Sequence, residues 1–404
     1  MGKGRKRGRI NRSMGSIFLF NPDHDLALAN NDANYMPPAA ARQLAADLAL
    51  LPIWYGGGDD FVLAPTKYNK AFLDEQRTFF HTLPSLLTLS ELADKPHRLS
   101  PWGWNPAVHK KFLECGVSSD VLPSLAKLEL IRQYSNRLQA VRLLPKLNKD
   151  THYCGESSYL TEMDSIRHLV ENHANCVLKA PLSGSGKGLN WCKGQFTFHI
   201  ERWCDNILKQ QGGVIFEPLY NKVVDFAMQF QADANGKLAF TGYSLFQTNS
   251  SGAYVGNIIA SDAEIEKELT TYVPIEALEQ VKEQIIGELS GVYADVYSGY
   301  LGVDMMVCSF PESPDYKIHP CVEINLRMTM GMVSRLLCDK YVYPGKTGVY
   351  HVGYYASPEE LKKAALKLAE EFPAEYSNGK MYNGYFPLVP VSPVSRYHAW
   401  VQVG

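Results

Sequence analysis

The sequence predicts a mixed α/β protein with more than one domain, and three observations support this. The chain has 404 residues. A single hydrophobic core usually supports a domain of roughly 150 residues, so a chain of this length is expected to form more than one domain. The apolar run 16–20 leads directly into the polar turn 21–25 and a segment rich in Ala and Leu, which is how an α/β domain begins. Farther along, residues 223–232 alternate with period two, whereas 274–292 carries one apolar stripe at helical spacing.

The first part of the chain is predicted to hold several short strands. After strand 16–20, the runs 53–55 and 61–64 read as two more strands. The three glycines and two aspartates of 56–60 separate them and favour a turn. We place a first domain at residues 14–120.

Helices and strands then alternate. Leucines and isoleucines recur every three or four residues between 123 and 147, which predicts an amphipathic helix with Arg132 and Arg137 on its polar side or at its end. A strand is expected at 176–180. Further helices are expected at 274–292, where Pro274 suits the first turn, and at 358–372. Strand-like pieces punctuated by proline close the chain.

Composition excludes several classes of protein. Hydrophobic residues make up 46%, charged residues 20%, and the formal net charge is -2, so no bulk field favours nucleic acid. The eight cysteines lack the close pairs of a zinc cage or disulfide framework, which predicts reduced thiols in a cytoplasmic protein. No apolar run approaches the roughly 20 residues that span a bilayer, so no membrane partner is expected.

Residues 1–13 are strongly basic and almost free of apolar side chains. Such a segment gains too little from burial to order itself, so a disordered tail, or a leader upstream of a working start at Met14, is expected. Nucleic-acid binding by this tail is the alternative. No interleaving of aromatic and basic residues elsewhere supports it.

A glycine-rich loop follows the strand that carries Lys179. It consists of Ser183, Gly184, Ser185, Gly186, Lys187 and Gly188. Glycines allow backbone N–H groups to approach phosphate oxygens, and a lysine on a strand supplies a fixed positive charge. A Walker A loop would need glycine at Pro181 and Ser or Thr at Gly188, so this loop belongs to another phosphate-binding design or is a plain flexible loop.

The next pair of strands offers a group that could hold ribose. Residues 214–217 form a predicted strand, 218–222 a hinge, and 223–232 a second strand. Its alternation places Asp225, Gln229 and Gln231 on the polar face, where Asp225 could accept hydrogen bonds from hydroxyl groups. A solvated strand residue is the alternative.

The strongest local pattern is Cys321 to Met328. Alternation brings Glu323, Asn325 and Arg327 to one face. Carboxylate and amide oxygens suit Mg²⁺, and a guanidinium can hold a phosphoryl group at two points. Asp304 interrupts the apolar strand 301–307, where an unpaired carboxylate is costly, so it would complete a magnesium site if the two strands were neighbours. A solvated polar face is the alternative.

Over residues 125–340, the order of strand lysine, glycine-rich loop, acidic hinge, ribose acid, Asp strand and Glu-x-Asn strand resembles the ATP-grasp superfamily. The resemblance implies a Rossmann-like N-terminal pre-ATP-grasp domain, followed by an ATP-grasp fold of two α+β subdomains that clasp ATP. These subdomains are expected at 121–212 and 213–404.

The resemblance also implies residue roles. Lys179 would contact the α- and β-phosphates, residues 183–188 would close over the triphosphate, and Asp225 would hold the ribose. Glu217, Pro218 and Leu219 would bind adenine largely through backbone groups. Asp304, Glu323 and Asn325 would ligate magnesium, and Arg327 would neutralise the transferred phosphoryl group or bind the carboxylate. Arg137 stands where the family usually has another nucleotide lysine, with the same charge but a different donor geometry.

The function implied is a ligase that uses ATP and Mg²⁺, with two ions or with Mn²⁺ in their place, to join a small carboxylate to an amine, less often to a thiol, through an acyl phosphate. A nucleotide-binding regulatory or scaffolding protein without catalysis is the alternative, although it would need no magnesium constellation. Oligomeric state stays open, homo-oligomers included.

Two segments are candidates for substrate contact. Asp23, His24 and Asp25 follow the first strand, at an edge where α/β domains commonly bind ligands, and these acids would suit an amine. Residues 248–256 form a polar, Gly-containing stretch. A capped and solvated turn is the alternative for the first segment.

Overall fold

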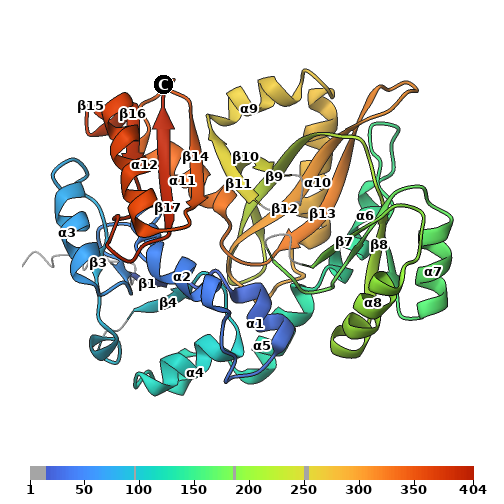
Figure 1. The fold of residues 1–404 in the computed structure, drawn as a ribbon, viewed down its shortest axis with the longest axis horizontal. Coiled ribbons are helices and arrows are strands. Elements are labelled where there is room, and N and C mark those ends of the chain that lie inside the picture. Colours follow the sequence, from blue (N-terminus) through green and yellow to red (C-terminus); the bar gives the residue numbers. More distant parts are fainter. Residues whose placement is uncertain (1–14, 95–96, 185–187, 250–253) are drawn as a thin grey trace, which may run out of the picture.

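The protein has three β-sheets flanked by helices, as seen in a computed structural model (Figure 1). The structure describes residues 15–94, 97–184, 188–249 and 254–404. The basic tail therefore lies outside the described residues. None of the helices within these ranges is long and apolar enough to cross a membrane.

The first sheet is parallel, with strand order β3-β2-β1-β4. It confirms that the chain begins as an α/β unit. Its strands and the neighbouring helices are β1 (Ser16–Leu19), α1 (His24–Asn30), α2 (Ala39–Asp47), β2 (Phe61–Val62), α3 (Lys67–Gln76), β3 (Ser85–Leu86), β4 (Arg98–Pro101) and α4 (Pro106–Glu114).

The strand predicted at 53–55 is wrong. Leu51–Trp54 is a short 3₁₀ helix, η1, with Pro52 in its first turn and all four side chains buried. A short apolar run that is buried on every side lacks the alternation that separates strand from helix. The predicted strand 61–64 is shorter than expected and ends at Val62.

The second sheet is antiparallel and small, with strand order β5-β8-β6-β7. It carries its own hydrophobic core with helices α7 and α8. Its elements are β5 (Ser158–Leu160), α7 (Met163–Glu171), β6 (Cys176–Lys179), β7 (Leu189–Cys192), α8 (Phe198–Gln211) and β8 (Val214–Pro218).

The third sheet has nine strands in the order β13-β12-β9-β10-β11-β14-β17-β16-β15, and its paired strands are antiparallel. The expected alternation of β9 is confirmed, because Phe226, Met228 and Phe230 are buried in the core while Asp225 faces the other side. The elements are β9 (Lys222–Ala232), β10 (Leu238–Thr248), β11 (Tyr254–Ile259), α9 (Asp262–Leu269), α10 (Ile275–Leu289), β12 (Gly299–Ser309), β13 (Tyr316–Asn325), α11 (Met330–Tyr341), β14 (Gly348–Tyr354), α12 (Pro358–Glu371), β15 (Glu375–Ser377), β16 (Lys380–Pro387) and β17 (Tyr397–Val403).

The helix predicted at 123–147 is two helices, α5 (Leu125–Tyr134) and α6 (Leu138–Leu147). Residues 135–137 separate them, and the Asn136 side chain accepts a hydrogen bond from the backbone N–H of Leu138 (2.8 Å), which competes with helical continuation. Arg137 directly precedes α6 and is only 6% exposed. It therefore lies at a helix end, one of the two places predicted for it, and not on a polar helix face.

The N-terminal sheet and the C-terminal strands share one hydrophobic core, which contains Trp54, Phe80, Tyr341 and Phe386. Figure 1 shows the blue N-terminal elements against the red C-terminal ones, with the green β6 to β8 region on the far side of β12 and β13. The proposed domain boundaries at 120 and 212 stay predictions.

Candidate active site

One cavity of about 640 Å³ lies between the small sheet, the nine-stranded sheet and the N-terminal elements. Lys179 from β6, Asp225 from β9, Asp304 from β12 and Glu323 from β13 all line it. Alternation in each strand brings these polar side chains to the face opposite the core. Four segments that are distant in sequence thus deliver charged groups to a single space.

Lys179 is buried beside Glu217. The lysine Nζ lies 2.5 Å from Glu217 Oε2, and their side chains are 8% and 7% exposed. Ser157 donates a second hydrogen bond to Glu217 Oε1 (3.2 Å). The family resemblance implied a role for Glu217 largely through its backbone, whereas in the structure its carboxylate pairs with the lysine. Such a pair fixes a positive charge at the cavity wall and would be costly to break at one partner.

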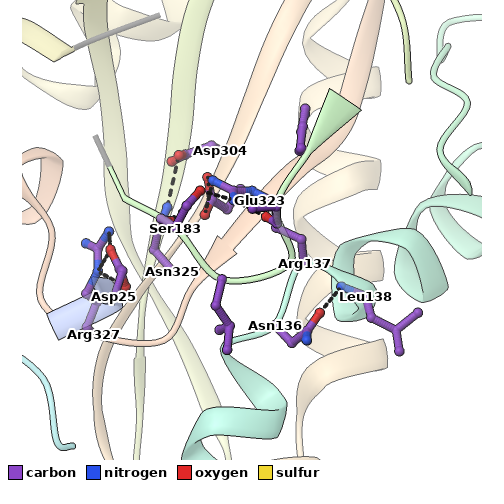
Figure 2. A network of polar contacts seen from close by, with 12 residues as sticks. Asp25, Asn136, Arg137, Leu138, Ser183, Asp304, Glu323, Asn325 and Arg327 are labelled. Carbon is purple, nitrogen blue, oxygen red and sulfur yellow. Dashed lines mark hydrogen bonds and ion pairs between the residues drawn. The ribbon is translucent and has the colours of Figure 1, made fainter. Parts of the chain in front are cut away.

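Arg137 connects the glycine-rich segment to β13. Its Nη1 donates to Ser183 Oγ (2.5 Å) and to the Ala180 carbonyl (2.7 Å). Its Nη2 lies 2.9 Å from Glu323 Oε1. Figure 2 shows the guanidinium between Ser183 and Glu323. The cation predicted to meet nucleotide therefore also holds a predicted metal ligand.

Asp304 and Glu323 stand opposite each other in the β12–β13 pairing, and Asn325 pairs with Gly302. Asn325 Nδ2 donates to Asp304 Oδ2 (2.9 Å), which leaves the amide oxygen free to ligate. Burial, with repulsion from Glu323, raises the pKa of Asp304 to about 7. A divalent cation would relieve this repulsion, so the donors fit magnesium. Within the described ranges no group of three or more His, Cys, Asp or Glu side chains is placed to hold a metal ion, so the candidate set consists of two carboxylates and one amide.

Asp225 has two polar neighbours at the cavity. Thr248 donates to its Oδ2 (2.9 Å), and Lys222 forms an ion pair with the same oxygen. Lys222 was not singled out in the sequence, because a lysine at the start of an exposed strand is usually solvated. An acceptor that is already held by a hydroxyl and an ammonium group is well oriented to bind a further hydroxyl.

The segment predicted to bind adenine borders an apolar part of the cavity. Glu217, Pro218 and Leu219 all line it, but the Leu219 N–H donates to the Asn175 carbonyl (3.1 Å). Adenine would therefore have to use other backbone groups there. The apolar lining of this end comes from Val177, Leu189, Trp191, Met306 and Val322.

The glycine-rich segment approaches the cavity closely at its described ends. A Cβ on Gly184 would lie 2.7 Å from Asp25 Oδ2, and one on Gly188 would lie 2.1 Å from Ser183 Oγ. The Ala180 N–H donates to the Gly188 carbonyl (2.8 Å) and closes the loop. A side chain at either position would therefore force the Asp25 carboxylate or the Ser183 side chain to move. Ser185, Gly186 and Lys187 lie outside the described residues.

Arg327 forms a two-point ion pair with Asp25. Its Nη2 lies 2.7 Å from Asp25 Oδ2 and its Nε lies 3.0 Å from Oδ1. Strand β13 ends at Asn325, so Arg327 lies just beyond the strand that the sequence predicted to carry it. Burial raises the pKa of Asp25, but the Arg327 guanidinium more than offsets this and holds that pKa below its usual value. Figure 2 shows the pair beside Asn325.

The other two polar residues of the first turn differ in position. Asp23 lines the cavity. His24 is 1% exposed and packs against Gly103, where an added Cβ would lie 2.4 Å from the ring. Burial lowers the pKa of His24 to about 4, so the imidazole is neutral at pH 7. In the predicted loop 248–256, Thr248 and Tyr254 line the cavity, while 250–253 lie outside the described residues.

Sequence reasoning missed a group of neutral residues at the end of the cavity beyond Arg327. Gln229, Ser244 and Asn257 are 1% to 2% exposed and line it. The sequence placed Gln229 on the polar face of its strand but had no signal for the other two. Aromatic residues from three distant segments, Trp102, Tyr354 and Tyr397, complete this end.

Solved structures resemble the chain over nearly its whole length. The biotin carboxylase complex from Campylobacter jejuni has a TM-score of 0.51 at 11% identity, over 97% of this chain and 88% of that chain. The biotin carboxylase domain of 2-oxoglutarate carboxylase from Hydrogenobacter thermophilus, in complex with MgADP, ADP and bicarbonate, has a TM-score of 0.50 at 9% identity, over 97% and 87%. N5-carboxyaminoimidazole synthetase from Staphylococcus aureus, complexed with ADP, gives 0.47 at 12% identity, over 96% and 93%.

No protein-family model matches the sequence, and no curated protein matches it. The first two structural likenesses confirm the predicted mixed α/β fold, and the Rossmann-like character of its N-terminal domain stays a prediction.

Proposed function

From the premise that the chain has the ATP-grasp fold, we propose that it is an ATP-dependent ligase that activates a carboxylate as an acyl phosphate and joins it to an amine. One observation carries the proposal. Lys179, Asp304, Glu323 and Asn325 line a single cavity although they come from three strands and two sheets. This is the combination of fixed cation and oxygen ligands that phosphoryl transfer needs.

The nucleotide would occupy the part of the cavity between the two sheets. Lys179 would meet the α- and β-phosphates, Arg137 and the loop 183–188 the triphosphate, and Asp225 the ribose. Adenine would lie against the apolar lining near Leu219. The complexes of the similar proteins contain β-γ-ATP or ADP, which supports ATP as the nucleotide.

Asp304, Glu323 and Asn325 would hold magnesium, and two ions could share these oxygens with the phosphates. When bound, magnesium neutralises charge on the phosphate oxygens. Glu323 would have to exchange its contact with Arg137 for the metal. The guanidinium that it releases would then face the phosphates, so the exchange keeps each charge compensated.

The reaction proceeds in two displacements. A carboxylate oxygen of the substrate attacks the γ-phosphorus, the bond from phosphorus to the bridging oxygen breaks, and ADP leaves. The amine nitrogen then attacks the acyl carbon, inorganic phosphate leaves, and the amine proton passes to solvent. The protein contributes position and charge compensation, which can lower such a barrier by several kcal/mol.

The test measures release of ADP and phosphate with Mg·ATP against a panel of amino acids, dicarboxylates and amines. We expect release that requires a carboxylate together with an amine and that is lost in Lys179→Ala and in Glu323→Gln. Asp205→Asn is the control, because this side chain on helix α8 is 46% exposed and pairs with Lys209 on the same helix. Full activity in either site variant would remove that residue from its role. Tight ATP binding without release for any member of the panel would favour a regulatory nucleotide-binding protein.

A further inference from the structure

One part of the cavity lining, next to Arg327 and Asp25, differs in chemistry from the rest, and we call it the second compartment. Its floor is made of four neutral polar side chains, Gln229, Ser244, Asn257 and Thr329. Its walls are apolar or aromatic and come from Leu26, Leu44, Trp102, Tyr254, Tyr354 and Tyr397. Leu26 directly follows Asp25 and Thr329 lies two residues after Arg327, and all four line the cavity, so the charged pair borders this compartment.

The polar floor satisfies its own hydrogen bonds. Gln229 donates to Ser244 Oγ (3.2 Å) and accepts from Thr329 Oγ1 (2.9 Å). Asn257 donates to the Leu245 carbonyl (3.1 Å) and accepts from the Tyr254 hydroxyl. None of these groups carries a charge. A charged ligand side chain would lose its hydration there without gaining an ion pair, so the compartment favours neutral side chains.

The entrance carries one positive and one negative group in direct contact. The Arg327 and Asp25 side chains are 17% and 18% exposed. A ligand with only a carboxylate could form an ion pair with Arg327, but it would leave Asp25 as an unpaired, largely buried charge. A ligand with only an amine would leave Arg327 unpaired in the same way. Loss of one partner from such a pair is strongly unfavourable.

A zwitterion avoids both costs, because its carboxylate can pair with Arg327 while its ammonium group pairs with Asp25. The two protein charges touch at 2.7 Å, so the two ligand charges must also lie close together, as in an α-amino acid. The aromatic residues of the compartment would then contact the side chain of the bound amino acid. Trp102 is held at this point by its carbonyl, which accepts from the Met328 N–H (3.0 Å), and Tyr354 and Tyr397 pack with ring centroids 5.0 Å apart.

We infer that this compartment binds an α-amino acid with an apolar or aromatic side chain, through Arg327 at the carboxylate and Asp25 at the ammonium group. The inference rests on the proposed ligase function for its reaction but not for binding. Arg327 is two residues from Asn325 and would bring the ligand carboxylate toward the phosphoryl site. The amino acid would therefore be the partner that is activated, and a separate amine would be the nucleophile.

The test is direct binding by isothermal titration calorimetry, with and without Mg·ADP. L-Phenylalanine is compared with 3-phenylpropanoate, which lacks the amine, and with phenethylamine, which lacks the carboxylate. We expect one molecule of phenylalanine to bind per chain, and each truncated analogue to bind about 100-fold more weakly. L-Glutamate, L-lysine and L-alanine should also bind more weakly. A truncated analogue or L-glutamate that equals phenylalanine would overturn the inference.

Asp25→Asn separates substrate contact from mere positioning of Arg327. If Asp25 binds the ammonium group, this variant loses the preference for phenylalanine over 3-phenylpropanoate. If Asp25 only positions Arg327, both ligands weaken equally and the inference fails. Should Asp25→Asn not fold, Trp102→Leu serves instead and should weaken phenylalanine more than L-alanine. An equal effect on these two amino acids would count against the compartment. Asp205→Asn is the control.

The two proposals fail in different ways. ATP binding is titrated on the same samples. If ATP binds and no α-amino acid does, the amino-acid site is wrong while the ligase proposal stands. If phenylalanine binds and ATP does not, the ligase proposal is wrong while the binding site stands.

Discussion

Arg137 and Glu323, 186 residues apart in the chain, form an ion pair of 2.9 Å across the cavity. The arginine is 6% exposed and the glutamate side chain 24%. The same arginine holds Ser183 and the Ala180 carbonyl. The contact therefore joins the segment that begins the glycine-rich loop to the strand that carries two of the proposed metal ligands.

Replacing only one partner of this pair should be costly. We expect Arg137→Met to lower the free energy of unfolding by about 3 kcal/mol, because it leaves Glu323 and Ser183 without a donor. Adding Glu323→Gln to that variant should restore part of the loss. Urea unfolding of the two single variants and the double variant gives the coupling energy. Strictly additive losses would show that the contact is energetically silent.

Magnesium affinity should increase as the pH rises through about 7. The pKa of Asp304 is raised to about 7 by burial and by Glu323, so below that pH a proton competes with the metal. Titration of Mg²⁺ into the protein between pH 6 and about 8 checks this. An affinity independent of pH would remove Asp304 from the ligand set.

Without bound metal, the Asp304 carboxyl group should also affect folding stability. Here the free energy of unfolding should fall, and not rise, as the pH increases. The folded state binds the Asp304 proton more tightly than the unfolded state, so this residue costs stability increasingly as the pH rises from its usual carboxyl range through about 7. We expect Asp304→Asn to raise the free energy of unfolding by about 1–2 kcal/mol at alkaline pH in EDTA. At acidic pH the variant and the wild type should converge. A variant that is less stable at alkaline pH would contradict this cause.

Asp225 should recognise the ribose hydroxyl groups. We expect the wild type to bind ATP about tenfold more tightly than 2′,3′-dideoxy-ATP, and Asp225→Ala to bind both equally. Competition binding with a fluorescent nucleotide measures both affinities. Thr248→Val is a useful companion, because it removes only the hydroxyl that donates to Asp225 and should reduce the preference without abolishing it. Preserved discrimination in Asp225→Ala would assign the ribose to another residue.

Gly155 should not accept any side chain. Its φ is +120°, and a Cβ would lie 2.7 Å from the ring of buried His319. We expect Gly155→Ala to destabilise the protein by about 2–4 kcal/mol through strain and overpacking. Gly287, inside helix α10, has nothing within 4 Å of its Cβ position, so Gly287→Ala should stabilise by about 0.5–1 kcal/mol. Thermal unfolding of the two variants should show shifts of opposite sign.

Sequence pattern predicted best where a strand alternates over many residues. The alternation in β9 and β13 identified Asp225, Glu323 and Asn325 as cavity residues, because period two assigns each side chain to a face. The same alternation implies that Val322 faces away from Glu323, yet Val322 also lines the cavity, where the β12–β13 register shifts between Asp304 and Met306. Such a bulge has no signature in the residues themselves.

Contacts between distant segments could not be read from the chain. The sequence marked Asp25 and Arg327 separately, but their pairing depends on how helix α1 packs against the end of β13. Lys179 and Glu217 likewise meet only because β6 and β8 are neighbours. Local pattern reports which face a residue occupies, and the partner on that face is set by tertiary packing.

The hydrophobic core shared by the first hundred and the last hundred and fifty residues has a mechanical consequence. Trp54 donates to the Leu388 carbonyl (2.6 Å), and Asp47 accepts from the backbone N–H groups of Arg396 and Tyr397. These hydrogen bonds, together with the shared core, hold the two ends of the chain together as one rigid block. The small β5 to β8 sheet has a hydrophobic core of its own. Nucleotide entry is therefore expected to depend on a rigid-body movement of this sheet relative to the block that carries the rest of the cavity.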